Sequence, residues 1–389
     1  MKKIFILILL LFVMVGCETT PTEPTEPIET EIPSVPNGLQ ALTAVTDCDV
    51  PTLEGGWVCI WADEFDGDAV DETKWTFEEG GFGGGNMEVQ YYSRDNAEVT
   101  DSKLIITARK EQMGGKEYTS ARMTTKYKGS FKYVRIVVSA KMPTGRGTWP
   151  AIWMMPLMNV YGGWPRSGEI DIMEYVGYDE NRIHSTIHTE KFNHNLGTQI
   201  GYSRLYEDVE TSFIEYEMIW TPGSIRTYVD GDKLGEFAYV PHFNQDVPYN
   251  QAFPFDQEFF LILNLAIGGT WGGAQGIDTT IFPTAMEVDY VRVYQQDYAL
   301  TDVEEPTQPT NIQLAQLKNT IFWNKSEDDY GVEKYAVYLD GAFHKYASLN
   351  QITFKSLSVG QAYQVRIQAV DFVGRVSEMS DTMSFTFSG

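Results

Sequence analysis

Residues Ser167–Gly177, SGEIDIMEYVG, set three carboxylates, Glu169, Asp171 and Glu174, among apolar side chains. In a regular β-strand alternate side chains share a face, so Glu169 and Asp171 point one way while Glu174 points the other. A β-bulge absorbs one extra residue and re-aims the rest of the strand. With a bulge at 172–173, all three carboxylates lie on one face of a sheet. The stretch therefore predicts a bulged strand that carries acid–base groups.

The spacing of the two glutamates bears on their chemistry. With the bulge they are effectively four strand positions apart, about 13 Å along the backbone, and side chains that lean together bring the carboxyls to roughly 5 to 6 Å. That separation is typical of a retaining glycosidase. The spacing alone is weak, because 54 acidic residues in 389 produce it about once by chance. Unpaired carboxylates in an apolar strand are costly unless they line a cleft, which favours catalysis over a solvated strand face.

Further segments accompany this stretch along the chain. In order, they are WADEFDG at 61–67, GGNMEVQYY at 84–92, ARMTTKYKGSFKYVRIVVSAKMPTGRGTWPAIWMMP at 121–156, WTPGSIRTYVDG at 220–231, FDQEFFLILNLAIGGTWGG at 255–273 and VDYVRVYQ at 288–295. From about residue 57 to residue 296 the chain resembles the laminarinase-like branch of glycoside hydrolase family 16. The resemblance implies an all-β fold, a concanavalin-like β-jelly-roll sandwich with an open substrate cleft, and retaining endo-hydrolysis of a β-glucan.

Carried over position by position, the resemblance gives each acid a role. Glu169 would be the nucleophile that forms the glycosyl-enzyme intermediate, and Glu174 the general acid that later activates water as a base. Asp171 would hydrogen-bond the nucleophile and keep the two glutamates in different protonation states. His188, in IHSTIHTE, occupies the place of a histidine that family members carry on the adjacent strand. By itself a lone strand histidine is more often simply packed.

The tryptophans fit a sugar-binding cleft, because flat indole faces stack on pyranose rings and their N–H groups bond hydroxyls. Trp149, Trp153, Trp164 and Trp271 fall in segments that line the cleft in relatives. Trp164 and Trp271 are the stronger candidates. Trp153 sits in the strand-like AIWMMP and can equally belong to the core, where most large aromatics pack.

Three polar residues also match positions that contact substrate in the family. Asn86 and Glu88 lie in GGNMEVQYY, and Arg122 is a weaker match in the next segment. Composition alone favours solvation of all three in loops or at a strand edge. Their place in a cleft therefore rests on the resemblance.

Net charge discriminates among substrates. The chain has a formal net charge of −25 and a sequence pI near 4.5. It repels polyanions over long range, so we expect no nucleic-acid partner and a neutral glucan rather than a sulfated algal polysaccharide. Arg166 and Arg182 can offset this repulsion locally. Relatives that cut agarose or carrageenan share the bulged motif, and bulged enzymes also cut mixed-linkage glucan, so these polymers stay open.

The N-terminus predicts export. Two lysines precede an apolar run at 4–15, which is short for a membrane span and suits a signal peptide. Gly16 and Cys17 follow, which resembles a bacterial lipoprotein signal with Cys17 lipidated, although Met14 stands where leucine is usual. We therefore expect a signal peptide at 1–17 and an exported lipoprotein in the periplasm or at the cell surface, held to the membrane by its lipid only. A plain secreted enzyme is the alternative.

Composition divides the rest of the chain. Residues 18–37, ETTPTEPTEPIETEIPSVPN, repeat Pro, Thr and Glu and predict an extended acidic tether. The catalytic domain is expected over 38–297. A second acidic, proline-containing segment, which includes TDVEEPTQP, predicts a linker at 298–309. The sequence pattern then changes at 310–389.

Residues 310–389 resemble a fibronectin type III domain, a small immunoglobulin-like β-sandwich. The likeness rests on Trp323 in the expected second strand, on the turn at Asp340-Gly341 and on LSVGQAYQVRIQAVD, where Leu357 and Tyr363 fit a tyrosine corner. A spacer or interaction module is the favoured role, and glucan binding is the alternative.

Two cysteines remain after Cys17. An oxidising location makes a disulfide between Cys48 and Cys59 the favoured state, and two free buried thiols the alternative. No spacing of zinc ligands is present, and no cofactor is expected for catalysis. The family resemblance implies a structural calcium ion held by Glu64 and Asp289 with backbone carbonyls, because calcium prefers oxygen ligands.

Three functions stay open from the sequence. The leading one is a monomeric endo-glycosidase that cuts internal β-1,3 bonds of laminarin-type glucans. The second keeps this mechanism on mixed-linkage glucan or an algal galactan. The third is a non-catalytic glycan-binding surface protein, because sandwich folds also serve lectins.

Overall fold

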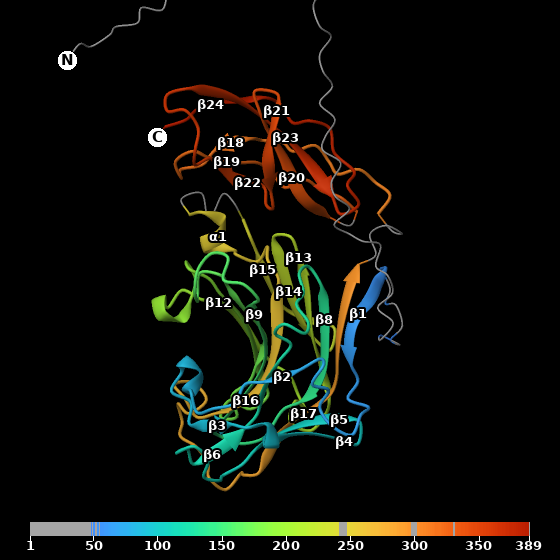
Figure 1. The fold of residues 1–389 in the computed structure, drawn as a ribbon, viewed down its shortest axis with the longest axis vertical. Helices are drawn as coiled ribbons and strands as arrows, with labels where there is room; N and C mark the ends of the chain where they lie inside the picture. Colours follow the sequence, from blue (N-terminus) through green and yellow to red (C-terminus); the bar gives the residue numbers. More distant parts are fainter. Residues whose placement is uncertain are drawn as a thin grey trace, which may run out of the picture. The chain divides into compact units, whose positions relative to one another are not determined.

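The computed structural model describes residues 48, 50, 53, 55–240, 247–296, 302–329 and 331–388. The predicted signal peptide, Cys17 and the tether lie outside these residues. Strands dominate the described chain and form two sandwiches, one on either side of the joint near residue 300 (Figure 1). Among the described residues, no helix has both the length and the apolar character that a membrane crossing requires.

The first sandwich consists of two antiparallel sheets. The front sheet runs in the order β12 (Ile200–Leu205), β11 (Arg182–His188), β10 (Glu169–Glu174), β9 (Thr148–Pro156), β16 (Phe259–Ile267), β7 (Arg122–Thr124) and β2 (Thr76–Phe77). The back sheet runs in the order β15 (Asp232–Ala238), β14 (Ser224–Val229), β13 (Ile214–Thr221), β8 (Arg135–Lys141), β17 (Thr284–Gln296), β5 (Lys103–Ala108) and β4 (Ala97–Thr100), and β1 (Trp57–Asp63) also pairs with β17.

Shorter elements complete this sandwich. A parallel pair joins β3 (Gln90–Tyr92) to β6 (Tyr118–Ser120). The helical turns among the described residues are α1 (Tyr249–Ala252) and the 3₁₀ turns η1 (Gly83–Gly85), η2 (Arg94–Asn96) and η3 (His194–Leu196).

The core lies between the two sheets because alternate side chains of each strand face inward. Ile152 and Ile170 of the front sheet and Val138 and Met218 of the back sheet belong to one fully buried apolar cluster. The other face of the front sheet is thereby left to polar and aromatic side chains. The all-β jelly-roll architecture expected from the sequence is the one observed.

The bulge predicted in β10 is confirmed by the strand register. Asp171 pairs with Thr186 of β11, whereas Glu174 pairs with His184, so residues 172–173 lie opposite a single residue. Consecutive strand residues normally face opposite ways, yet Ile172 and Met173 both belong to the core cluster. The bulge therefore returns Glu174 to the outer face of the front sheet.

The second sandwich has its own core, which includes Trp323, Val337 and Phe385. Its strands form the sheet β18 (Gln313–Leu314), β19 (Thr320–Phe322) and β22 (Gln351–Thr353) and the sheet β21 (Ala342–Ala347), β20 (Val332–Leu339), β23 (Ala362–Asp371) and β24 (Met383–Thr386). At the start of β23 the Tyr363 hydroxyl accepts a hydrogen bond from the backbone N–H of Ser358 at 3.0 Å. This is the contact that a tyrosine corner makes.

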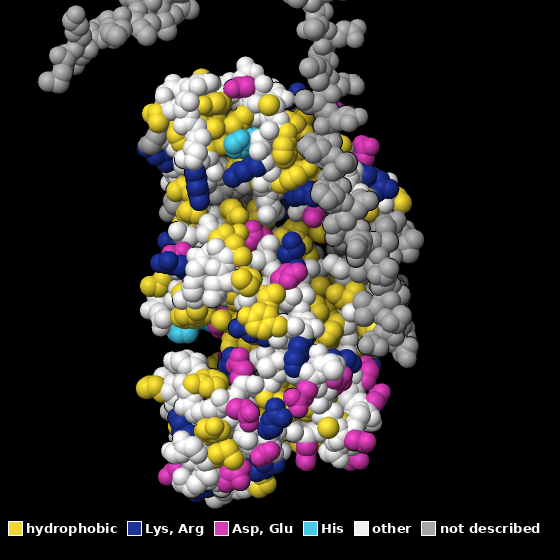
Figure 2. Space-filling model, viewed as in Figure 1, with side chains coloured by type: hydrophobic (Ala, Val, Ile, Leu, Met, Phe, Trp, Pro, Cys, Tyr) yellow, Lys and Arg dark blue, Asp and Glu magenta, His cyan; other side chains and the backbone are white. Residues whose placement is uncertain are grey.

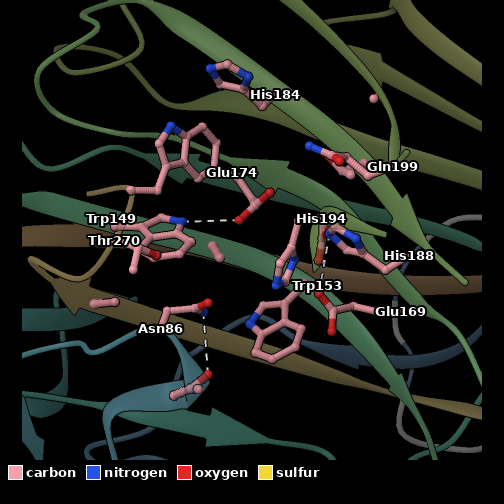
Figure 3. Close-up of a pocket in the computed structure, with 18 of the residues that line it drawn as sticks. Asn86, Trp149, Trp153, Glu169, Glu174, His184, His188, His194, Gln199 and Thr270 are labelled. Atoms are coloured by element: carbon pink, nitrogen blue, oxygen red, sulfur yellow. Dashed lines mark hydrogen bonds and ion pairs between the residues drawn. The ribbon is translucent and has the colours of Figure 1, made fainter. Parts of the chain in front are cut away.

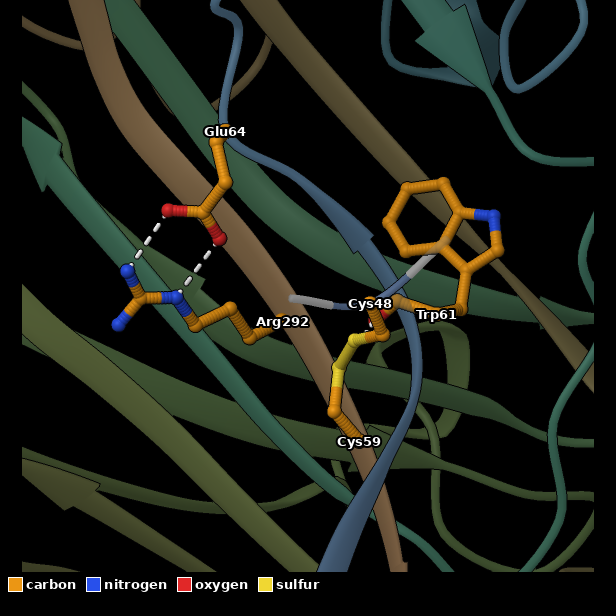
Figure 4. The surroundings of a disulfide bond; sticks show 5 residues. All are labelled: Cys48, Cys59, Trp61, Glu64 and Arg292. Carbon is orange, nitrogen blue, oxygen red and sulfur yellow. Dashed lines mark hydrogen bonds and ion pairs between the residues drawn. A yellow bond between two sulfur atoms is a disulfide. The ribbon is translucent and has the colours of Figure 1, made fainter. Parts of the chain in front are cut away.

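The cysteines at the start of the first sandwich are bonded to each other. The structure joins the sulfurs of Cys48 and Cys59 in a disulfide, with the Cα atoms 6.0 Å apart (Figure 4). Cys59 lies in β1 and Cys48 packs against the same small apolar cluster. The bond closes a short loop at the start of the domain and holds it to β1.

Candidate active site

A cavity of about 660 Å³ lies on the outer face of the front sheet. Its lining comes from β7, β9, β10, β11, β12 and β16 and from the loops around residues 84–88, 194–199 and 270–271. Figure 2 shows the larger sandwich hollowed at its margin, with a histidine side chain beside the notch. The volume is in the usual range for a small-molecule site. Every predicted catalytic and substrate residue except Trp164 lines this cavity.

The three carboxylates of β10 lie on the cavity floor. The Glu169 side chain is 17% exposed and that of Asp171 only 4%. Nε2 of His188, on the neighbouring strand β11, lies 3.4 Å from Asp171 Oδ2 and 3.8 Å from Glu169 Oε1. Glu174 stands further along β10, and its Oε1 accepts a hydrogen bond from Trp149 Nε1 at 3.1 Å (Figure 3). The two glutamates therefore have different partners.

Burial dominates the electrostatics of these acids. It raises the pKa of Glu169, Asp171 and Glu174 well above the ordinary carboxyl range, because the charged forms lose hydration. The charge of Asp171 raises the pKa of both glutamates further, while His188 opposes the shift. The Trp149 hydrogen bond also lowers the pKa of Glu174. The cluster consequently retains protons at neutral pH, as a general acid requires.

Indole rings form the walls of the cavity. Trp149 and Trp271 meet edge to face with ring centroids 5.4 Å apart. Trp153 also faces the cavity rather than the core, and its Nε1 donates to Asn264 Oδ1 at 2.7 Å. Trp164 lies outside the lining, with its ring 5.0 Å from that of His194. Aromatic faces with fixed N–H groups suit the alternating apolar and hydroxyl surfaces of a sugar.

The predicted polar residues occupy the same cavity. Glu88 is buried, and its Oε2 accepts hydrogen bonds from Gln90 Nε2 at 2.8 Å and Tyr92 OH at 3.0 Å. Asn86 lies nearer the opening, where its amide donates to the carbonyl of Gly84 at 3.4 Å. These groups give the cavity fixed hydrogen-bonding partners beside the tryptophans.

Arg122 has its own partner inside the cavity. Its guanidinium lies 2.6 Å from a Glu78 carboxylate oxygen and 4.7 Å from the Trp153 ring centroid. Among the described residues that line the cavity, it is the one arginine or lysine. The cavity therefore presents no unpaired lysine or arginine to an anionic substrate.

Other residues of the cavity were not predicted from the sequence. His184 shares the outer face of β11 with His188 and packs edge to face on Trp271, with ring centroids 4.9 Å apart. The even spacing of the two histidines within one strand is a signal that would have found it. His194 and Gln199 enter from the segment between β11 and β12, and no motif marks them (Figure 3).

Glu64, one of the two acids expected to hold calcium, has an arginine as its partner. Both Glu64 oxygens accept hydrogen bonds from Arg292, at 2.8 and 2.7 Å (Figure 4). Two acidic groups among the described residues have the geometry to hold a metal ion, and neither contains Glu64 or Asp289. The calcium site expected at Glu64 and Asp289, with backbone carbonyls, stays a prediction.

Comparison with known proteins gives a consistent result. The sequence profile of the family described as Glycosyl hydrolases family 16 matches residues 85–292. A beta-glucanase from Rhodothermus marinus is 47% identical over 245 residues, which cover 61% of this chain and 85% of the relative.

Solved structures agree with the sequence relatives. The laminarinase from Rhodothermus marinus matches with a TM-score of 0.60 and 47% identity, over 62% of this chain and 98% of that one. A non-specific endo-beta-1,3(4)-glucanase from family GH16, crystallised with a glucan oligosaccharide, matches with a TM-score of 0.59 and 40% identity, over 64% of this chain and 98% of that one. The profile match includes the bulged strand and covers more than half of the chain. The chain therefore belongs to glycosyl hydrolase family 16.

Proposed function

We propose that this glycoside hydrolase cuts internal β-1,3-glucosidic bonds of laminarin-type glucans with retention of configuration. The observation that carries the proposal is the bulge in β10, because it places Glu169, Asp171 and Glu174 together on the floor of a tryptophan-walled cavity. Double displacement requires two carboxyls that flank the scissile bond, one to attack the anomeric carbon and the other, on the opposite side, to protonate the leaving oxygen. The laminarinase and beta-glucanase names of the relatives support the substrate.

In the first step Glu169 attacks the anomeric carbon and forms a covalent glycosyl-enzyme ester. The bond to the leaving oxygen breaks as Glu174 donates its proton to that oxygen. In the second step Glu174, now a carboxylate, takes a proton from water, and the resulting hydroxide attacks the same carbon and frees Glu169. Two inversions give net retention, and each proton is accounted for.

The neighbours of the two glutamates suit these roles. His188 lies beside the Glu169 end of the cluster, where a positive or hydrogen-bonding partner favours the ionised nucleophile. Burial and the charge of Asp171 raise the pKa of Glu174, although His188 and the Trp149 hydrogen bond lower it, so Glu174 can keep its proton until the leaving oxygen needs it. Asp171 lies between the two, and as a like charge it keeps the pKa of Glu174 high.

Charge in the cavity favours a neutral polymer. Arg122 is already paired with Glu78, and burial lowers the pKa of His184 and His194, so these rings stay uncharged at neutral pH. A sulfate group would therefore meet carboxylates without a free cation in the described lining. Mixed-linkage glucan is the second candidate, because a related structure is named as a non-specific endo-beta-1,3(4)-glucanase.

The parts of the chain outside the catalytic sandwich complete the proposal. We infer that the C-terminal sandwich is a fibronectin type III domain, supported by its two small sheets and by the Tyr363–Ser358 hydrogen bond. Its proposed role is that of a spacer. Lipidation of Cys17 and anchoring of a monomer at an exported membrane face are proposed from the signal sequence alone.

The test is reducing-end release on a panel of four polymers: β-1,3-glucan, mixed-linkage glucan, agarose and carrageenan. We expect preferential cleavage of β-1,3-glucan, with the β-anomer as the first product by NMR. If the protein cleaved only agarose or carrageenan, the proposed substrate would be wrong, but the proposed mechanism with two carboxyl groups would stand. Binding of β-1,3-glucan without cleavage of any polymer would instead support a glycan-binding protein, and a β-1,3-glucan-binding protein is among the relatives.

A further inference from the structure

A second acidic cluster lies in the C-terminal sandwich, far from β10 in sequence. Asp302 precedes the first strand of this sandwich, and Asp328 and Asp329 lie between β19 and β20. Each contributes one carboxylate oxygen to a group whose members all lie within 4.8 Å of one another. Asp302 is 1% exposed, whereas Asp329 is exposed. Carboxylates this close together repel one another, which costs electrostatic free energy.

Among the described residues, two buried carboxylate oxygens at or beside this cluster have no hydrogen-bond donor. Oδ2 of Asp302 is buried and accepts no hydrogen bond. The same is true of Oδ2 of Asp371, a fully buried residue at the end of β23. The other oxygen of Asp371 accepts from the backbone N–H groups of Val373 and Arg375, at 2.9 and 2.8 Å. A buried carboxylate oxygen without a donor indicates a missing positive partner.

The described residues supply one positively charged partner for the buried Asp302 and Asp371. Among the described residues, Arg375 lies within ion-pair distance of Asp302, at 3.3 Å, and of Asp371, at 4.0 Å. One arginine therefore lies within ion-pair distance of both Asp302 and Asp371. A divalent cation would remove the imbalance.

We propose that Asp302, Asp328 and Asp329 bind a calcium ion. Calcium takes oxygen ligands at about 2.3–2.6 Å, so ligands on opposite sides of one ion are about 4.6–5.2 Å apart. The 4.8 Å limit of the cluster matches that span. The three ligands are all carboxylates, without a histidine or cysteine, which disfavours zinc and copper. Asp371 is not one of the three ligands, but its carboxylate would add negative charge near the ion.

The ion would cross-link two segments at the start of the second sandwich. Asp302 belongs to the segment that leads into this domain, and its carbonyl already accepts a hydrogen bond from Arg375 at 2.6 Å. The same segment is tied to the loop before β20, since Thr307 N–H donates to the carbonyl of Glu327 at 2.8 Å. Calcium at the cluster would bind the entering segment to that loop, and so stabilise the sandwich where the chain enters it.

The test is calcium titration of the full chain after removal of metals with EDTA, by calorimetry and by thermal unfolding. We expect one site with an affinity in the range of extracellular calcium modules, about 10⁻⁴–10⁻³ M, and a rise in Tm at about 10 mM CaCl₂. Asp329→Asn removes an exposed ligand that the metal-free fold does not need. It should weaken binding at least about tenfold and abolish the rise in Tm, as should Asp302→Asn.

Two controls locate the ion. Asp381→Asn alters an exposed aspartate of the same sandwich and should leave calcium binding unchanged. Asp289→Asn tests the position expected in the first sandwich. Calcium binding that survives in both Asp329→Asn and Asp302→Asn, or that is lost in Asp289→Asn alone, would overturn the proposal. So would the absence of any binding at about 10 mM CaCl₂. If Asp302→Asn fails to fold, Asp329→Asn decides the question.

Discussion

Two acidic clusters in this chain have similar composition and different surroundings. Glu169, Asp171 and His188 offer ligand atoms within 4.8 Å of one another, and so do the three aspartates of the C-terminal sandwich. The first group, however, lies in a cavity of about 660 Å³ with tryptophan walls. The second group includes the buried Asp302, whose Oδ2 accepts no hydrogen bond from the described residues. A roomy cavity admits a substrate, whereas a tight cluster of carboxylate oxygens suits an ion.

The origin of the carboxylates also differs. In the cleft Glu169, Asp171 and Glu174 come from one strand, and the bulge fixes the face they share. Each glutamate also has its own neighbour, His188 beside Glu169 and Trp149 beside Glu174. The three aspartates of the other cluster come from two segments, Asp302 from the one before β18 and Asp328 and Asp329 from the one between β19 and β20. Acidic residues thus take their function from the partners and the space around them.

The largest effect is expected from Glu169→Gln. Loss of the nucleophile should lower cleavage of β-1,3-glucan by roughly 10⁴-fold or more, because no other group can form the covalent intermediate. Reducing-end release measures this, with Glu117→Gln as a control at an exposed glutamate. Binding of oligosaccharide should persist in the variant. Retention of more than about a tenth of the activity would remove Glu169 from the role of nucleophile.

Glu174→Ala should cost less, and in a way that depends on the leaving group. General acid catalysis contributes about 10²–10⁴-fold, so glucan cleavage falls by that factor. An aryl β-glycoside with an acidic phenol needs no proton from the enzyme and should form the intermediate at nearly the normal rate. Added azide should then speed turnover and yield a β-glycosyl azide. An α-glycosyl azide would exchange the roles of the two glutamates.

Much of the cleft was predictable because its information is local. The apolar pattern around Glu169 and the odd spacing of Glu174 require a bulge if all carboxylates share a face, and the structure has that bulge. Trp149 and Trp271 also lie where the motifs suggested. Gln199 reaches the cavity through a loop whose path depends on tertiary packing. Trp164 is not part of the lining, but its ring lies 5.0 Å from that of His194 and 6.1 Å from that of His188, which both line the cavity.

The C-terminal cluster shows what a sequence alone does not give. Asp302 lies in a segment predicted as a linker, while Asp328 and Asp371 are separated from it by strands. Only the fold brings these charges together. The partner of Glu64 is likewise distant in sequence, since Arg292 donates to both oxygens of that side chain.

Asp171→Asn tests how far the cleft acids act as one unit. The charge of Asp171 raises the pKa of Glu174, so its removal should lower that pKa. The alkaline limb of the profile of kcat against pH should therefore move to lower pH, because Glu174 loses its proton earlier. The maximal kcat should fall by about 10- to 100-fold. A variant with a lower kcat and an unmoved alkaline limb would confine Asp171 to a packing role.

A smaller effect of Glu169→Gln is expected on stability. This substitution should stabilise the folded protein although it lowers the activity. Burial raises the pKa of Glu169 in the folded protein, so the folded state binds more protons than the unfolded one above about pH 4.5. Its contribution therefore becomes destabilising as pH rises through that window. Glu169→Gln should raise Tm at neutral pH by about 2–4 °C for each kcal/mol gained, and the gain should vanish near pH 4.5. Glu117→Gln should change Tm at neither pH.

The smallest effect expected is that of EDTA on hydrolysis, and it tests the contrast between the clusters most directly. Glu169, Asp171 and His188 have the geometry of a metal site, yet double displacement uses their protons and charges and needs no ion. EDTA should therefore change kcat on β-1,3-glucan by less than about twofold, while Tm falls as the C-terminal cluster loses its proposed calcium. If instead EDTA abolished hydrolysis and calcium restored it in Asp329→Asn, the ion would belong in the cleft. The surroundings of an acidic cluster would then not suffice to tell a proton site from a metal site.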